Sequence, residues 1–293
     1  MILRKGFYAA EKRGVAGKAA CAPSEEMKSI NFCKFHGFGN DYIVIEQSEL
    51  AEVSNLSEFS QKICQRNTGV GSDGIAVLEK LENLAADYSC RIINPDGSEA
   101  GFSGNGTRCA VAYLYYKNLF SAENLKLQTK SGVKNYEFLS RAENTFWFRA
   151  ELGMPLAITN YQLPITNYQL PVITLDVGNP VCVIFVDDFS LDWRNIGKEI
   201  ESHAHFPERT NVVFVRIIDS ENIEIRIWER GSGETSSSGT CSIAAAVASA
   251  FAKKTARKVS VHAEGGTTET VWREDDEMII TGRADLVFCG EYF

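Results

Sequence analysis

The chain has 293 residues, of which 44% are hydrophobic and 23% charged, a composition typical of a globular protein with a substantial core. Its formal net charge of −8 argues against a surface for nucleic acid or anionic lipid, because both bind basic faces. No run of about 18 apolar residues occurs, so we expect no membrane span.

The eight cysteines are scattered, form no C-x-x-C pair, and in several cases lie in apolar runs. This pattern favours reduced, buried thiols in a cytoplasmic protein over a disulfide framework or a zinc site. The four histidines add no spacing typical of metal ligands, so no metal is expected. Residues 1–26 are basic and lack the apolar segment of a secretory signal, and we expect a disordered N-terminal extension there.

Short runs of β-branched and aromatic residues predict strands in the first half of the chain. These runs are 30–35, 42–45, 75–78 and 88–93. Residues 56–66 predict a helix, and so do residues 106–119. The second of these helices is apolar on nearly every face, so we expect it to be buried.

The second half repeats this order. Strands are predicted by four further runs, 172–175, 181–186, 211–218 and 223–228. They lead into a glycine-containing loop and then into residues 241–251, which are small and apolar all round. We therefore expect a second buried helix, equivalent to the first.

One heptapeptide, Ile-Thr-Asn-Tyr-Gln-Leu-Pro, occurs twice without change, at 158–164 and 165–171. A single perfect tandem copy with two prolines is unlike a repeat architecture, which needs several imperfect copies. We interpret it as a recent duplication in a connector, at the place where an interdomain linker is expected.

Two loops that precede the buried helices are alike: Gly-Phe-Ser-Gly-Asn-Gly-Thr at 101–107 and Ser-Ser-Ser-Gly-Thr at 236–240. Each sets a serine and a glycine before a helix, whose free N–H groups and positive end can bind a carboxylate or phosphate. The two loops predict two halves that present matching segments to one shared site. Taken singly, Ser103 and Ser238 are also good helix N-caps, which is the purely structural alternative.

Other polar residues at strand edges could fix an amino acid. Glu229 and Arg230 supply both signs, because a guanidinium suits a carboxylate and a glutamate suits an ammonium. Asparagines stand next to predicted strands at Asn40, Asn94, Asn179 and Asn211. Taken one at a time, these asparagines are better explained as surface turns. The glycine spacing matches neither a P-loop nor the dinucleotide-binding fingerprint.

Five motifs in order make the chain similar to the diaminopimelate epimerase family, from about Met27 to the C-terminus. They are F-H-G-F-G-N-D at 35–41, N-x-D-G-S-E at 94–99, G-N-G-x-R-C at 104–109, G-N-P at 178–180 and E-R-G-x-G-E-T at 229–235. The resemblance implies an α+β fold of two pseudo-symmetric domains, each a mixed β-sheet or barrel wrapped around a central helix. The expected domains are 27–147 plus 284–293 and 148–283, after the extension at 1–26.

The resemblance also implies an isomerase without a cofactor that converts LL- into meso-diaminopimelate, a precursor of lysine and peptidoglycan. One group takes the α-proton on one face, and a second returns a proton on the other. The family's two catalytic cysteines align with Ser103 and Ser238. The substrate-binding residues implied by motif position are Asn40, Asn94, Gly104, Asn105, Asn179, Asn211, Glu229, Arg230, Gly239 and Thr240. The expected partner is a small amino acid in the cytoplasm, not nucleic acid or a membrane, and a homodimer is compatible with the sequence.

The chain departs from the family at the reacting centre. A serine hydroxyl is a far weaker acid than a thiol, and the family's histidine after Gly-Asn-Pro is Val181 here. Two alternatives therefore stay open: a divergent isomerase of another amino or carboxylic acid that uses Glu229, Asp41 or Asp96, and an amino-acid-binding protein without catalysis. A further interpretation is a true epimerase in which both cysteines were replaced to trap a complex. Val181 weighs against it, because silencing the two thiols would not require a change at this position.

Overall fold

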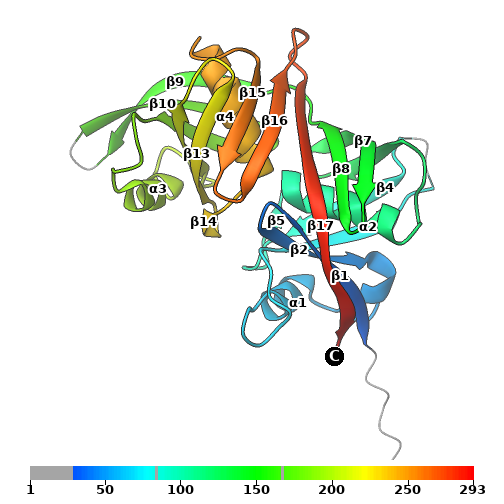
Figure 1. The fold of residues 1–293 in the computed structure, drawn as a ribbon. Helices are drawn as coiled ribbons and strands as arrows, with labels where there is room; N and C mark the ends of the chain where they lie inside the picture. The colour runs from blue at the N-terminus through cyan, green and yellow to red at the C-terminus, as the bar shows by residue number, and fades with distance from the viewer. Residues whose placement is uncertain (1–28, 83–84, 166–167) are drawn as a thin grey trace, which may run out of the picture.

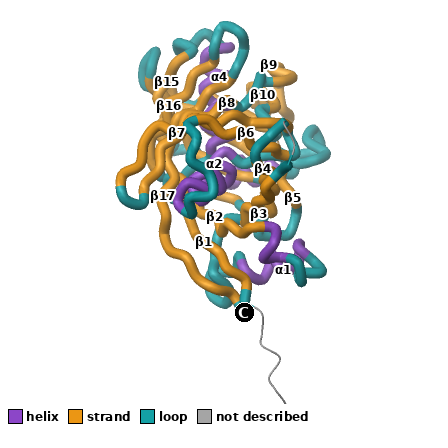
Figure 2. The backbone as a smooth tube through the Cα atoms, turned by 90° about the vertical axis from the view of Figure 1, so that its right-hand side faces the viewer, coloured by secondary structure: helices purple, strands orange, loops and turns teal. Residues whose placement is uncertain are grey.

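The computed structural model describes residues 29–82, 85–165 and 168–293, so the expected extension at 1–26 lies outside the described residues. The chain folds into two halves, in each of which a mixed sheet wraps around one buried helix (Figure 1). A view turned by 90° shows the strands of the first half surrounding helix α2 (Figure 2). The fold expected from the motifs is therefore confirmed.

In the N-terminal half the central helix is α2 (Gly104–Tyr116), which is buried along almost its whole length because it is apolar on nearly every face. Two short helices, η1 (Gln47–Leu50) and α1 (Leu56–Ile63), lie outside the sheet. The strands are β1 (Ile30–Gly37), β2 (Asn40–Glu46), β3 (Ile75–Lys80), β4 (Tyr88–Ile93), β5 (Glu99–Ala100), β6 (Asn124–Thr129), β7 (Gly132–Ala142) and β8 (Thr145–Glu151).

In the C-terminal half the central helix is α4 (Gly239–Phe251), buried from Gly239 to Ser249, and α3 (Trp193–Glu201) lies outside the sheet. The strands are β9 (Leu156–Ile165), β10 (Tyr168–Asp176), β11 (Pro180–Phe185), β12 (Asn211–Ile217), β13 (Asn222–Glu229), β14 (Gly233–Thr235), β15 (Lys258–Ala263) and β16 (Gly266–Trp272). All the strands predicted from the sequence are present, with ends shifted by a few residues.

The same order of pairings occurs in both halves. In the first, β2 pairs parallel with β3, β3 antiparallel with β4, β4 with the short β5, and β4 parallel with β6. In the second, β11, β12, β13, β14 and β15 pair in the same sequence and directions. Each central helix follows the short strand of its half, so the two helices occupy equivalent places.

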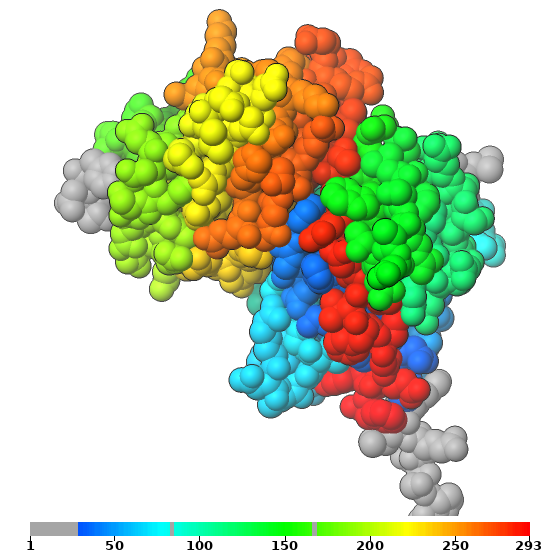
Figure 3. Space-filling view, in the orientation of Figure 1, coloured from blue at the N-terminus to red at the C-terminus, as the bar shows by residue number. Residues whose placement is uncertain are grey.

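The last strand, β17 (Met278–Tyr292), joins the two halves. It begins beside β16, continues along β8, and ends antiparallel to β1, so the two ends of the described chain lie side by side (Figure 3). Strand β8 runs through the expected domain boundary at 147/148. The division into 27–147 plus 284–293 and 148–283 stays a prediction.

The duplicated heptapeptide is not a connector, and that expectation is wrong. Its two copies contribute to β9 and β10, which form an antiparallel hairpin at the outer edge of the C-terminal half (Figure 1). The equivalent leucines of the two copies, Leu163 and Leu170, pair directly, and Leu163 is fully buried against Trp193 and its neighbours. The strand alternation of the repeat therefore gives the hairpin an apolar inner face.

The expectation of reduced cysteines is wrong for one pair. Cys33 on β1 and Cys289 on β17 form a disulfide, because the strand register sets them directly opposite each other with Cα atoms 4.0 Å apart. The remaining cysteines of the described residues are buried free thiols, as expected: Cys64, Cys90, Cys109, Cys182 and Cys241. In the described part of the chain, no helix is long and apolar enough to cross a membrane.

Candidate active site

The first turns of α2 and α4 touch each other between the two halves. A β-carbon built on Gly104 would lie 2.9 Å from the Cα atom of Gly239, and the reverse contact has the same length. Any side chain at either position would force the two helices apart, so only glycine permits this approach. The structure thus brings the two matching loops together, as their repetition in the sequence predicts.

Both helix starts are capped in the same way. Ser103 accepts a hydrogen bond from the Gly106 N–H at 3.0 Å, and Ser238 accepts one from the Cys241 N–H at 3.4 Å. The structural role that the sequence suggested for the two serines is therefore present. Besides capping its helix, each serine hydroxyl is hydrogen bonded to another side chain.

The caps leave backbone donors free. Among the described residues, the N–H groups of Gly104, Asn105, Gly239 and Thr240 have no hydrogen-bond partner. Neither helix has an acidic residue in its first turn, so two positive helix ends abut and, in the described part of the chain, the one carboxylate bonded to a capping serine is that of Glu229. This arrangement favours a bound anion such as a carboxylate.

Ser103 is hydrogen bonded to a tyrosine that the sequence analysis did not single out. The Tyr42 phenol oxygen lies 2.9 Å from Ser103 Oγ, and the ring is 6% exposed. Burial, reinforced by the nearby Glu229 carboxylate, raises the pKa of Tyr42 well above its usual value. The phenol therefore keeps its proton and can donate it.

Ser238 is paired with a carboxylate instead. Its hydroxyl donates to Glu229 Oε2 at 3.0 Å, and the Thr235 hydroxyl donates to Glu229 Oε1 at 2.8 Å. Burial raises the pKa of Glu229 to about 7, against the smaller lowering effect of these two hydrogen bonds. Glu229 is therefore poised to gain and lose a proton near neutral pH, as a general base requires.

A small cavity of about 30 Å³ lies at the meeting of the two halves. Six of the predicted site residues line it: Asn40, Asn94, Ser103, Asn179, Glu229 and Arg230. Tyr42, Asp73, Ala100, Phe102 and Ser232 complete the lining. Ser238 does not line the cavity but is hydrogen bonded to Glu229, which does. The other five predicted residues also lie outside the lining: Gly104, Asn105, Asn211, Gly239 and Thr240. A space of this size holds about one water molecule, so a larger ligand requires the lining residues to move apart.

Two of the predicted asparagines line the cavity and are hydrogen bonded to residues around it. Asn40 donates to Asp73 Oδ2 at 2.8 Å and accepts from Asn105 Nδ2 at 3.1 Å. Asn179 donates to the Phe102 carbonyl oxygen and so links the two halves next to Ser103. These asparagines are buried, which corrects the simple interpretation of them as surface turns.

Asn211 and Asn94 bond to residues near them in the fold. Asn211 is buried and accepts from the Arg230 N–H at 2.9 Å, while the Arg230 guanidinium donates to the Glu208 carbonyl oxygen at 2.9 Å. Asn94 donates to Ser98 Oγ at 3.0 Å within its own turn. Asn211 thus supports Arg230 from behind, and Arg230 itself reaches the cavity.

The remaining candidates have structural surroundings. Val181, at the position of the family's histidine, is 1% exposed and packs in the core. Burial raises the pKa values of the Cys109 and Cys241 thiols far above neutrality, so neither thiol can replace the missing thiolates. Asp41 forms ion pairs with Lys34 and Arg66, and Asp96 does not line the cavity.

Two cavity residues that the sequence analysis missed, Tyr42 and Asp73, stand beside motifs that could have indicated them. Tyr42 directly follows the motif at 35–41, and Asp73 stands in the glycine-rich segment T-G-V-G-S-D-G at 68–74. Burial raises the pKa of Asp73, with a further contribution from the neighbouring Asp41 carboxylate. Within the described ranges, no group of three histidine, cysteine or acidic side chains lies close enough to hold a metal ion.

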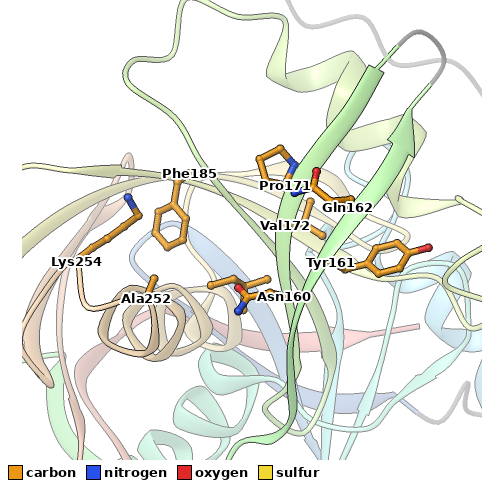
Figure 4. Close-up of a pocket in the computed structure, with 9 residues that line it drawn as sticks. Asn160, Tyr161, Gln162, Pro171, Val172, Phe185, Ala252 and Lys254 are labelled. Carbon is orange, nitrogen blue, oxygen red and sulfur yellow. The ribbon is translucent and has the colours of Figure 1, made fainter.

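A roomier pocket of about 410 Å³ lies elsewhere, beneath the β9–β10 hairpin (Figure 4). Phe185 and Lys254 lie on one side of it and the two hairpin strands on the other. Its lining comprises Asn160, Tyr161, Gln162, Pro171, Val172, Ile173, Phe185, Ala252 and Lys254. This pocket contains none of the predicted site residues and no carboxylate, so it offers no acid–base pair.

Comparison with known proteins agrees with this geometry. The family model for diaminopimelate epimerase matches residues 32–153 and 173–287. The chain belongs to the diaminopimelate epimerase family. It is 36% identical over 279 residues to the diaminopimelate epimerase of Pelotomaculum thermopropionicum, an alignment that covers 90% of this chain and 99% of that protein. The chloroplastic diaminopimelate epimerase of Oryza sativa subsp. japonica is 33% identical over 305 residues, with 95% and 84% covered.

Solved structures show the same fold at low sequence identity. A hydroxyproline epimerase from Agrobacterium vitis, solved with trans-4-hydroxy-L-proline, has a TM-score of 0.72 at 13% identity and covers 90% of this chain and 91% of its own. A PhzF-family phenazine biosynthesis protein from Bacillus anthracis has a TM-score of 0.67 at 16% identity, with 91% and 100% covered. As a member of the diaminopimelate epimerase family, the chain is an isomerase of the epimerase class. The stretch 154–172, between the two matched segments, contains both copies of the duplicated heptapeptide.

Proposed function

We propose that the protein epimerises diaminopimelate at its α-carbon, with Glu229 as the base on one face and Ser103 as the proton donor on the other. The carrying observation is that these two side chains, from different halves, line one cavity beside the paired helix starts. The sequence relatives support diaminopimelate as the substrate, because those compared are diaminopimelate epimerases.

The four free N–H groups at the helix starts would hold the substrate's α-carboxylate. Hydrogen bonds from backbone donors to a carboxylate stabilise the negative charge that develops when the α-proton leaves. Gly104 and Asn105 supply two of these donors from α2, and Gly239 and Thr240 supply two from α4. The carboxylate would therefore hold the α-carbon between the two serine loops.

Glu229 would take the α-proton with Ser238 as its partner. The Ser238 hydroxyl stabilises the ionised carboxylate by a hydrogen bond, and the buried setting keeps the carboxylate basic. On the opposite face the Ser103 hydroxyl would return a proton to the carbanion. A carboxylate and a hydroxyl would thus transfer the protons that, by the resemblance, two thiols transfer in the family.

The remaining polar residues of the lining would recognise the rest of the substrate. Arg230 suits a carboxylate, and Asn40, Asn94 and Asn179 offer amide donors and acceptors. Asn211 would act by holding the Arg230 backbone. The lining would have to move apart to admit the substrate, because the cavity is too small for it.

The test is to incubate the protein in deuterated water with LL- and with meso-diaminopimelate and to follow the α-proton signal by NMR. Exchange of the α-proton together with interconversion of the isomers supports the proposal. Saturable binding by calorimetry without exchange would instead show an amino-acid-binding protein. The Ser103→Cys/Ser238→Cys double variant checks the substrate, because a lack of exchange even with both thiols restored would refute diaminopimelate.

A further inference from the structure

The hydrogen bonds of Ser103 determine where its own proton can point. A serine oxygen has two lone pairs and one proton. One lone pair accepts from the Gly106 N–H at 3.0 Å. The phenol of Tyr42 stays protonated, lies 2.9 Å away and has no other hydrogen-bond partner among the described residues. Either hydroxyl can donate in this pair, and with the phenol as donor its hydrogen goes to the second lone pair of Ser103. The Ser103 proton is then the one part of the hydroxyl left for the cavity.

We propose that Tyr42 is the source of the proton that Ser103 delivers to the α-carbon, an inference that rests on the proposed function. Tyr42 and Ser103 both line the cavity, and their oxygens form a two-member chain from the buried phenol to the substrate. Tyr42 acts through Ser103 and is in this sense a positioning and proton-supplying residue.

The electron pair of the α-carbanion forms a new Cα–H bond with the Ser103 proton, while the Ser103 O–H bond breaks. The Tyr42 O–H bond breaks as its proton moves to Ser103 Oγ, so the serine ends as a neutral hydroxyl and Tyr42 as a phenolate. When the product leaves, water protonates the phenolate and accepts the proton that Glu229 took from the substrate. Both residues are then restored.

Other groups near Ser103 are less suited to supply this proton. Asp73 accepts hydrogen bonds from Asn40 at 2.8 Å and from Arg66 at 2.6 Å, so its carboxylate oxygens are already bound. Cys109 lies on α2 with its thiol in the core. Without Tyr42, delivery of the proton would leave Ser103 as a buried alkoxide. Among the described residues, no cationic side chain is hydrogen bonded to Ser103 to stabilise that charge.

The two faces of the site are consequently unequal. Glu229 can take the α-proton, exchange it with solvent and return it to the same face without any help from Tyr42. Inversion needs a proton from the opposite face and therefore needs the phenol. Tyr42 should thus control inversion and leave exchange with retention unaffected.

The test compares Tyr42→Phe with Tyr136→Phe. Each change removes one buried phenol oxygen, bonded to the N-cap of α2 in the case of Tyr42 and to Thr107 in its first turn, at 2.5 Å, in the case of Tyr136. Tyr136 does not line the cavity. Both α-deuterium incorporation and isomer interconversion are measured from LL- and meso-diaminopimelate in deuterated water. Tyr42→Phe is expected to slow inversion by about 100-fold or more, the usual size of a general-acid effect, and to keep exchange with retention. Tyr136→Phe is expected to keep both.

Inversion at the wild-type rate in Tyr42→Phe would overturn the proposal, and so would an equal loss of exchange and inversion, because that result describes a structural role. A second variant gives an independent check. Ser103→Cys introduces a group that is acidic by itself, so the Tyr42→Phe/Ser103→Cys protein should recover inversion, and failure to recover it also contradicts the proposal. If the wild-type protein itself shows no exchange, the proposed function is refuted as well. This outcome differs from failure of the Tyr42 proposal alone, because it is seen without any substitution.

Discussion

Gly104 and Gly239 meet at the point where the two halves of the molecule touch, each with its Cα atom 2.9 Å from the place of the other's absent β-carbon. This contact fixes the separation of two helix N-termini and hence the position of four free N–H groups. The geometry of the site therefore depends on two residues that have no side chain.

Gly104→Ala or Gly239→Ala should push the helices apart. We expect a loss of about 1–3 kcal/mol in the free energy of unfolding, as for other overpacked contacts, together with weaker binding of the substrate carboxylate. Chemical denaturation and calorimetry measure the two effects. Gly290→Ala is the matched control, because its added β-carbon makes only ordinary contact with Phe32 at 3.4 Å. Wild-type affinity in both site variants would show that the helix starts do not hold the carboxylate.

The rate of α-proton exchange should rise with pH through about 7 and then level off. Glu229 must be ionised to act as a base, and its pKa is raised to about 7 by burial. Glu229→Gln should abolish exchange at every pH. Glu224→Gln on the same strand should have no effect, since Glu224 pairs with Arg216 and Arg226 away from the cavity. A rate that is flat between pH 5 and 9 would exclude Glu229 as the base.

The same raised pKa has a consequence for stability. The folded state holds the Glu229 proton more tightly than the unfolded chain does, so Glu229 contributes stability that is fully present below about pH 4.5. That contribution is lost as the pH rises through about 7. As the pH rises through this range, the unfolding free energy of the wild type should therefore fall relative to that of Glu229→Gln. An unchanged difference from pH 4 to pH 8 would contradict the shift.

Arg230→Ala should weaken binding of the substrate by about 2–4 kcal/mol if its guanidinium pairs with a substrate carboxylate inside the closed site. Calorimetry on the wild type and the variant measures this. Arg194→Ala is the control, because Arg194 pairs with Glu234 on the surface of the same half. Equal affinity of the Arg230 variant and the wild type would remove Arg230 from the substrate-binding residues.

The Cys33–Cys289 disulfide should stabilise the fold by joining residues 256 positions apart. Reduction is expected to cost about 2–5 kcal/mol in unfolding free energy, measured by denaturation with and without reductant. The Cys33→Ser/Cys289→Ser protein should show the lower value under both conditions. If alkylation of the unfolded, unreduced protein labels Cys33 and Cys289 as free thiols, the bond is absent in solution.

Local patterns predicted most of the elements and the shared site. The all-round apolar segments became α2 and α4, and β4 spans the predicted residues 88–93. The paired Ser-Gly loops predicted the contact of the two helix starts. These features depend on the period and composition of short segments, which a sequence displays directly.

What the sequence did not predict depends on pairing between distant segments. The partners of the two serines, Tyr42 and Glu229, differ although the loops are alike. The duplicated heptapeptide resembled a linker because of its prolines, and only the pairing of Leu163 with Leu170 makes it a hairpin. The disulfide likewise follows from the register of β1 and β17.

The central claim is that Glu229 and Ser103 face the same α-carbon from opposite sides. Its most direct test is mass spectrometry of the meso-diaminopimelate formed from the LL isomer in deuterated water. We expect one deuterium at each inverted α-carbon, delivered from the solvent-exchanged Ser103 hydroxyl. A meso product without deuterium, or no product and no deuterium in the recovered LL isomer, would contradict it.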